Sequence, residues 1–154
     1  MINKIIMEKF LDGDNENLDI PEGYTLGTVE SIEDEKQWEK LISEVFNFQC
    51  DIDKHLKNEG IYSRDRVFVL KYNNKIIATA TAWYRPEYGA RTGYLHMVAV
   101  DSNFRGKGLS KIVVMAAILY MIDEGKERVV LKTNSYRIAA IGLYKKLGLS
   151  LIHI

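Results

Sequence analysis

The feature that most constrains the fold is a basic, glycine-rich loop placed directly before a long apolar run. Residues 98–110 are V-A-V-D-S-N-F-R-G-K-G-L-S, and residues 112–122 are eleven consecutive apolar residues. The run predicts a helix that is buried on most sides, and the valines before the loop favour a strand. We therefore expect a strand, a phosphate-sized loop and a core helix in succession.

The composition of this loop favours an anionic ligand. Gly106 and Gly108 allow the backbone to curl, so that several N–H groups can point into one concavity at the helix start. Arg105 and Lys107 add positive charge to the positive end of the helix dipole, which favours a di- or triphosphate. Lys111 stands where a dinucleotide fingerprint needs its third glycine, and no Gly-Lys-Ser/Thr sequence of a P-loop is present. An ordinary basic turn would also account for these letters.

Composition narrows the class of protein. The chain has 154 residues with 21 basic and 21 acidic side chains, which favours one globular domain without the net field typical of nucleic-acid or membrane binders. We expect neither of those partners. The single cysteine, Cys50, excludes an intramolecular disulfide and a cysteine-based zinc site. The N-terminal residues 1–10 contain no apolar run of signal-peptide length, and the run 112–122 is too short to span a bilayer, so a cytoplasmic location is expected.

Hydrophobic periodicity predicts an α+β domain with the element order βααβββαβαβ. Strands are expected at residues 24–29, 66–72, 75–84, 94–100, 128–132 and 149–154. Helices are expected after Ser31, at 51–58, over the apolar run 112–122, and at 138–147. The acidic stretch 12–19 before Pro21 is interpreted as a solvated lead-in. We therefore expect a lead-in over residues 1–20 and one domain over residues 21–154.

Two segments resemble motifs of the GNAT superfamily of N-acetyltransferases. Residues 105–110 resemble its acetyl-CoA loop, Arg/Gln-x-x-Gly-x-Gly/Ala, with Ser110 at the last position. Residues 140–149 are similar to its Ala-Ile-x-Leu-Tyr-x-x-x-Gly-Phe segment, with Leu149 in place of Phe. The expected element order from residue 24 onward also matches, and a weaker similarity around Pro21 points to GNAT domains of mycothiol synthases. The resemblance implies an α/β sandwich with a mixed, mostly antiparallel sheet flanked by helices.

The resemblance also implies a reaction. In GNAT enzymes a primary amine attacks the thioester of acetyl-CoA directly in a ternary complex, without an acyl-enzyme and without a metal. A small-molecule amine is the expected acceptor, a peptide or protein amine is possible, and the chain could be a monomer or a homodimer. The alternatives are a non-catalytic acetyl-CoA-binding module and a plain nucleotide binder.

Three residues are candidates for catalysis. The resemblance assigns Tyr144 as the proton donor to the leaving thiolate. His96 has an intrinsic pKa near 7 and is a candidate base, while Tyr94 could share a water with it at a position where the family often has glutamate. A carboxylate from elsewhere, such as Glu87, is another candidate base. Each of these side chains could instead be ordinary packing.

The cofactor site is expected on both sides of the loop. Strict alternation along the strand would place Tyr94, His96, Val98 and Val100 on one face. The resemblance implies that N–H groups near Val98 meet the oxyanion and that Val100 pairs with the pantetheine arm. The expected cofactor-binding residues are Val98, Val100, Arg105, Gly106, Lys107, Gly108, Leu109, Ser110, Asn134 and Arg137. Arg137 stands where the family often has asparagine. Residues 38–60 and 83–91 are expected to line the amine side.

Overall fold

The computed structural model describes residues 4–12 and 18–152, and its centre is a seven-stranded mixed sheet. The strands are β1 (Lys4–Phe10), β2 (Tyr24–Thr28), β3 (Val67–Tyr72), β4 (Lys75–Trp83), β5 (Thr92–Val100), β6 (Arg128–Asn134) and β7 (Ser150–Leu151). Their order across the sheet is β2-β3-β4-β5-β6-β1-β7. All neighbouring pairs are antiparallel except β5 and β6, which are parallel.

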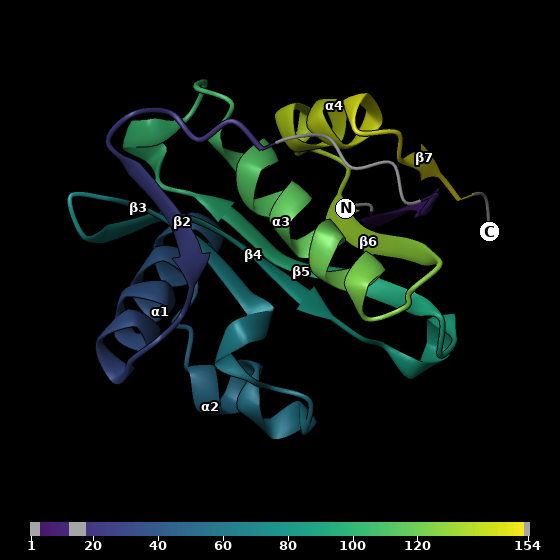
Figure 1. Ribbon diagram of the computed structural model, residues 1–154, viewed down its shortest axis with the longest axis horizontal. Helices are drawn as coiled ribbons and strands as arrows, with labels where there is room; N and C mark the ends of the chain where they lie inside the picture. Colours follow the sequence, from purple (N-terminus) through teal and green to yellow (C-terminus); the bar gives the residue numbers. More distant parts are fainter. Residues whose placement is uncertain (1–3, 13–17, 153–154) are drawn as a thin grey trace.

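Helices cover both faces of this sheet (Figure 1). Helices α1 (Ile32–Phe46) and α2 (Ile52–His55) lie on one face, and α3 (Leu109–Asp123) and α4 (Ile138–Lys146) lie on the other. Each face has its own apolar core. One core gathers the buried side of α3 with Met7 and Tyr144, and the other surrounds Trp38 of α1. The expected α/β sandwich is confirmed.

Local sequence signals account for several element boundaries. The Ser31 hydroxyl accepts a hydrogen bond from the Asp34 N–H and caps α1, as the sequence predicts. Asn73 and Asn74 both have positive φ, the geometry that closes a tight hairpin between β3 and β4. Helix α3 is buried along most of its length, which agrees with its nearly uniform apolar sequence.

The first strand is the main difference from the expected order. Strand β1 pairs with β6 over seven residues, from Lys4 opposite Asn134 to Phe10 opposite Arg128, and Met7 is fully buried. The prediction that the folded part begins near Tyr24 is therefore wrong, because part of the expected lead-in is an inner strand. Within the acidic stretch 12–19, residues 13–17 lie outside the described part of the chain.

Two other elements are shorter than expected. The helix expected over residues 51–58 is the single turn α2 followed by a 3₁₀ turn, Lys57–Glu59, and Gly60 ends it with positive φ. The last strand is limited to β7, with one further backbone bond from the Ile152 N–H to the Ile6 carbonyl. Residues 153–154 of that predicted strand lie outside the described residues.

Candidate active site

The site lies where β5 and β6 separate. Their parallel pairing covers only Thr92–Tyr94 opposite Arg128–Val130, although both strands continue further. The opening beyond this pairing forms a cavity of about 700 Å³. It is lined by Lys4, Val45, Phe46, residues 94–100, Phe104, Arg105, Gly106, residues 108–110, residues 131–134, residues 136–140, Leu143 and Tyr144.

A β-bulge in β5 shapes one wall of this cavity. Met97 has φ 54°, and the register with β4 shifts between Thr79, which faces Ala99, and Thr81, which faces His96. The extra residue reverses the alternation. Tyr94, Met97 and Ala99 accordingly belong to the core below α1, whereas Val98 and Val100 pack toward α3. The prediction that Tyr94, His96, Val98 and Val100 share one face is therefore wrong.

The glycine-rich loop adopts the expected turn at the start of α3. Gly106 and Gly108 have φ of 79° and 74°, and Gly108 occupies the N-cap of α3 without any capping side chain. The first N–H groups of the helix therefore lack a side-chain acceptor, which suits an anion. A Cβ at either glycine would meet no atom within 4 Å, so the conformation, not crowding, requires glycine.

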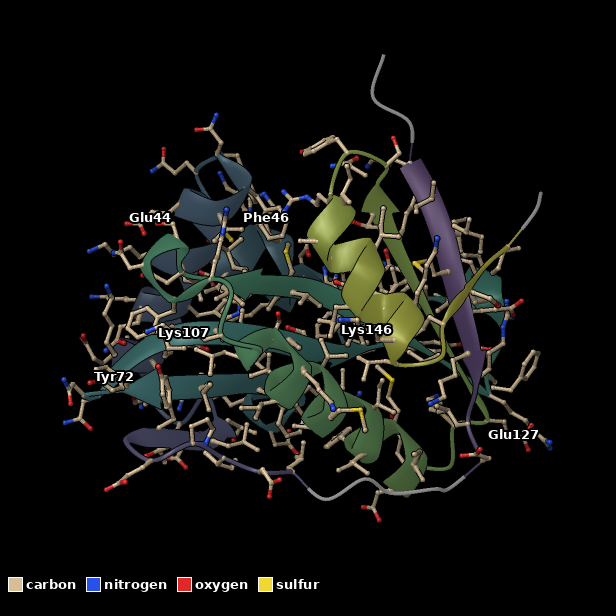
Figure 2. The ribbon with its side chains drawn as sticks, turned by 90° about the horizontal axis from the view of Figure 1, so that it is seen from above. Glu44, Phe46, Tyr72, Lys107, Glu127 and Lys146 are labelled. Atoms are coloured by element: carbon tan, nitrogen blue, oxygen red, sulfur yellow. The ribbon has the colours of Figure 1, made fainter. Side chains whose placement is uncertain are left out.

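Nine of the ten residues expected to bind the cofactor line this cavity. The exception is Lys107, whose ammonium lies 5.5 Å from the centroid of the Phe104 ring. Figure 2 shows Lys107 on the loop before α3. Asn134 has a buried Oδ1 without a hydrogen-bond partner, so the far side of the cavity retains an unused acceptor.

Tyr144 of α4 lines the cavity from the α3 side. The side chain is only 5% exposed, and burial raises the pKa of its phenol to about 12, opposed by the nearby charge of Arg137. The phenol is therefore protonated at neutral pH and is able to donate a proton.

His96 and Tyr94 line the cavity from the α1 side, with ring centroids 5.6 Å apart. Burial, assisted by the positive charge of Arg85, lowers the pKa of His96 to about 3. The imidazole is therefore neutral at pH 7 and is a weaker base than its intrinsic pKa suggests. Burial raises the pKa of Tyr94, which is 8% exposed and remains a neutral phenol.

The connection 83–91 supports Tyr94 but does not line the cavity. Tyr88 stacks on Tyr94 with ring centroids 5.9 Å apart, and the Arg85 guanidinium lies 5.0 Å from the Tyr94 ring centroid. Glu59 pairs with Arg85 and accepts a hydrogen bond from the Trp83 indole. Glu87 is exposed and is not one of the lining residues.

Two features of the site were not found from the sequence. Lys4 reaches the cavity because β1 pairs with the end of β6. The short apolar run 5–7 was the available signal for this strand. The Met97 bulge has no signature in the residue types. Of the residues expected on the amine side, Val45 and Phe46 at the end of α1 do line the cavity.

No group of three or more His, Cys, Asp or Glu side chains among the described residues could hold a metal ion. In the same part of the chain, no helix is long and apolar enough to cross a membrane.

A mixed sheet flanked by helices, with a glycine-rich loop at the opening between two parallel strands, agrees with the acetyltransferase fold that the sequence motifs implied. Comparison with known proteins identifies the family. Residues 28–149 match the acetyltransferase (GNAT) family, which is most of the chain, and the chain belongs to that family.

Curated relatives are similar over parts of their length. N-alpha-acetyltransferase 30 of Xenopus laevis is 41% identical over 58 residues, which are 38% of this chain and 21% of that protein. Mycothiol acetyltransferase of Pseudarthrobacter chlorophenolicus is 23% identical over 139 residues, which are 84% of this chain and 43% of that protein. The chain thus spans less than half the length of these relatives.

A solved structure supports the fold at full length. The GCN5-related N-acetyltransferase from Sphaerobacter thermophilus superposes with a TM-score of 0.82 at 20% identity. The match covers 99% of this chain, β1 included, and 49% of that chain.

Proposed function

We propose that this chain transfers an acetyl group from acetyl-CoA to a primary amine. The observation that carries the proposal is the convergence on one cavity of an uncapped helix start with Arg105, a pair of separated parallel strands, and a buried, protonated Tyr144. Membership of the GNAT family supports the same reaction. The cytoplasmic location expected from the sequence is part of this proposal.

In this proposal the two sides of the cavity have different tasks. The start of α3 and Arg105 bind the phosphates, and the free edge of β5 near Val98 and Val100 orients the rest of the cofactor. Acetyl-CoA supplies the thioester, at which a C–N bond forms with the amine and the C–S bond breaks. Tyr144 donates its proton to the departing thiolate and regains one from solvent.

The proton lost by the amine needs an acceptor. Because His96 has a pKa of about 3, the imidazole serves better as a hydrogen-bond partner for water than as the final base. We assign His96 and Tyr94 the role of orienting a water that carries this proton to solvent.

One observation favours a second candidate function. No acidic residue occurs among the described residues that line the cavity, and His96 is a weak base. An acetyl-CoA-binding module without turnover would need neither a carboxylate nor a strong base in the cavity. This second candidate uses the same glycine-rich loop to bind acetyl-CoA and differs from the acetyltransferase only in that no acetylated product forms.

The test is product formation. The purified chain is incubated with acetyl-CoA and a panel of amines, thiol release is followed against a background without amine, and the products are identified by mass. Acetylated amine formed in proportion to enzyme supports the proposal. Binding of acetyl-CoA without product from any amine favours the second candidate.

A further inference from the structure

The charges of the cavity bear on which amine it accepts. Of the described residues that line it, Lys4, Arg105, Lys132 and Arg137 are cationic and none is acidic. Arg105 belongs to the glycine-rich loop, whereas the other three come from β1, β6 and the start of α4. Like charges in a binding site disfavour a ligand of the same sign. A polycationic amine is therefore a poor match for this cavity.

The guanidinium of Arg137 lies on the side of the sheet away from the phosphate loop. It lies 4.5 Å from the centroid of the Phe46 ring and 5.6 Å from that of Tyr136. Phe46 ends α1 and packs against the core on the α1 face, opposite α3. Figure 2 shows Phe46 at the end of α1, at a distance from Lys107 and the loop before α3. Arg137 thus faces the amine side of the cavity, which differs from the expectation that it binds the cofactor.

Arg137 has unused hydrogen-bonding capacity there. No carboxylate of the described residues forms an ion pair with it, and its guanidinium contacts the rings of Phe46 and Tyr136. A ring that contacts the face of a guanidinium leaves the N–H groups on its edge free, and this planar edge matches a carboxylate in bidentate geometry. Arg137 and Tyr144 line the same cavity, and the charge of Arg137 acts on the Tyr144 phenol, so the two groups lie close to one another.

The walls beside Arg137 are apolar. Val45 and Phe46 of α1 and Met97 of the β5 bulge line this part of the cavity. Such walls favour an apolar substituent on the ligand, because its burial removes apolar surface from water.

We propose that the acceptor is an α-amino acid with an apolar side chain. The inference rests on the proposed acetyltransferase activity. The carboxylate pairs with Arg137, the side chain packs against Phe46, and the amine, one carbon from the carboxylate, faces the thioester near Tyr144. The nitrogen forms the new bond to the acetyl carbon, the C–S bond breaks, and the amine proton leaves through water.

The experiment compares three acceptors that each carry a primary amine but differ in whether they have a carboxylate and in their positive charge. Thiol release is measured at saturating acetyl-CoA with leucine, leucinamide and spermine, and rates are corrected for the fraction of free amine at the assay pH. We expect kcat/KM for leucine to exceed that for leucinamide by about tenfold or more, the effect of one charge-assisted pair. Spermine should be the poorest of the three.

Variants of α4 assign this preference to one residue. In Arg137→Gln, kcat/KM for leucine should fall about tenfold or more, while that for leucinamide stays within about twofold. Arg137→Lys should restore part of the preference, since it keeps the charge without the planar fork. Lys146→Gln, an exposed change on the same helix, is the matched control and should alter neither rate.

Several results would overturn the inference. One is equal or better turnover of leucinamide or spermine by the unchanged chain, which would point to a peptide or polyamine acceptor. Another is an equal loss of kcat/KM for all acceptors in Arg137→Gln. A large loss of acetyl-CoA affinity in this variant would likewise overturn it, because Arg137 would then be a cofactor-binding residue.

Failure of the proposed function gives a different result. If acetyl-CoA binds but no amine is acetylated, calorimetric binding of leucine to the CoA complex tests the inference directly, and binding that does not depend on Arg137 overturns it. If acetyl-CoA itself does not bind, the proposed function fails.

Discussion

At the scale of single residues, the two candidate proton-transfer groups have opposite electrostatic surroundings. Burial keeps Tyr144 protonated, which suits a proton donor, whereas burial and Arg85 keep His96 unprotonated, which makes it a weak base. The sequence identifies both residues through their motif or their intrinsic pKa. It does not give these shifts, because they depend on burial and on Arg85, which lies eleven positions before His96 and reaches it only in the folded sheet.

Removal of the Tyr144 hydroxyl tests its role. In Tyr144→Phe, we expect kcat to fall about tenfold to a hundredfold with the acetyl-CoA Kd nearly unchanged. This decrease in kcat lies at the low end of the range typical for removal of a general acid, because a thiol with a pKa of about 8.5 leaves readily without protonation. Tyr120→Phe is the matched control, because it removes a hydroxyl near the C-terminal end of α3, outside the cavity lining. Unchanged kcat in Tyr144→Phe would contradict the assignment.

The low pKa of His96 predicts a pH dependence of stability. The unfolded chain protonates this imidazole near pH 6.5 and the folded chain near pH 3, so the unfolded state binds more protons between these values. The contribution of His96 is thus complete above pH 6.5 and is lost as pH falls toward 3, by at most about 1.4 kcal/mol per pH unit. Urea titrations at pH 7 and at pH 5 measure this loss as a difference in the free energy of unfolding. In His96→Gln, the decrease from pH 7 to pH 5 should be smaller than in the unchanged chain. A slope equal to that of the unchanged chain would contradict the buried, neutral imidazole.

At the scale of elements, short local motifs were the most predictable part of the structure. The loop 105–108, the cap at Ser31 and the helix ending near Gly148 each depend on a few consecutive residues, and each is found where expected. The bulge at Met97 and strand β1 were not predicted. Both depend on pairing with distant strands, β4 in one case and β6 in the other.

The conformation of Gly108 provides a test of the loop. In Gly108→Ala, the left-handed φ of 74° should cost about 1–2 kcal/mol, and the acetyl-CoA Kd should rise because the first N–H groups of α3 shift. Gly27→Ala on β2 is the matched control, since its added Cβ also meets no atom within 4 Å and its φ is not left-handed. Calorimetric titration with acetyl-CoA would show the difference. Equal affinity in all three proteins would argue against a phosphate at this helix start.

Strand β1 gives a prediction about stability. Met7 is fully buried against the α3 core, so Met7→Ala should lower the free energy of unfolding by about 2–5 kcal/mol. Phe10→Ala on the same strand is the control, because Phe10 is 70% exposed and its loss should change stability by less than about 0.5 kcal/mol. Urea unfolding measures both. Equal small effects would mean that β1 is not an inner strand.

At the scale of the whole molecule, the sheet has two parts joined across the site. Strands β2–β5 form one part and β6, β1 and β7 the other, and only three residue pairs between β5 and β6 connect them within the sheet. Helix α3 packs on β3, β4 and β5, which all belong to the first part. A ligand held between β5 and β6 would add contacts across this short junction between the two parts.

The most direct test is the melting temperature with acetyl-CoA, CoA, ATP and NAD, all at one concentration, about a hundred times the Kd expected for acetyl-CoA. Acetyl-CoA that binds only the folded chain should stabilise it by about 2.7 kcal/mol under these conditions. The account predicts a rise of several degrees with acetyl-CoA and CoA and a smaller or absent rise with ATP and NAD. No rise with acetyl-CoA, or a larger rise with ATP or NAD, would contradict it.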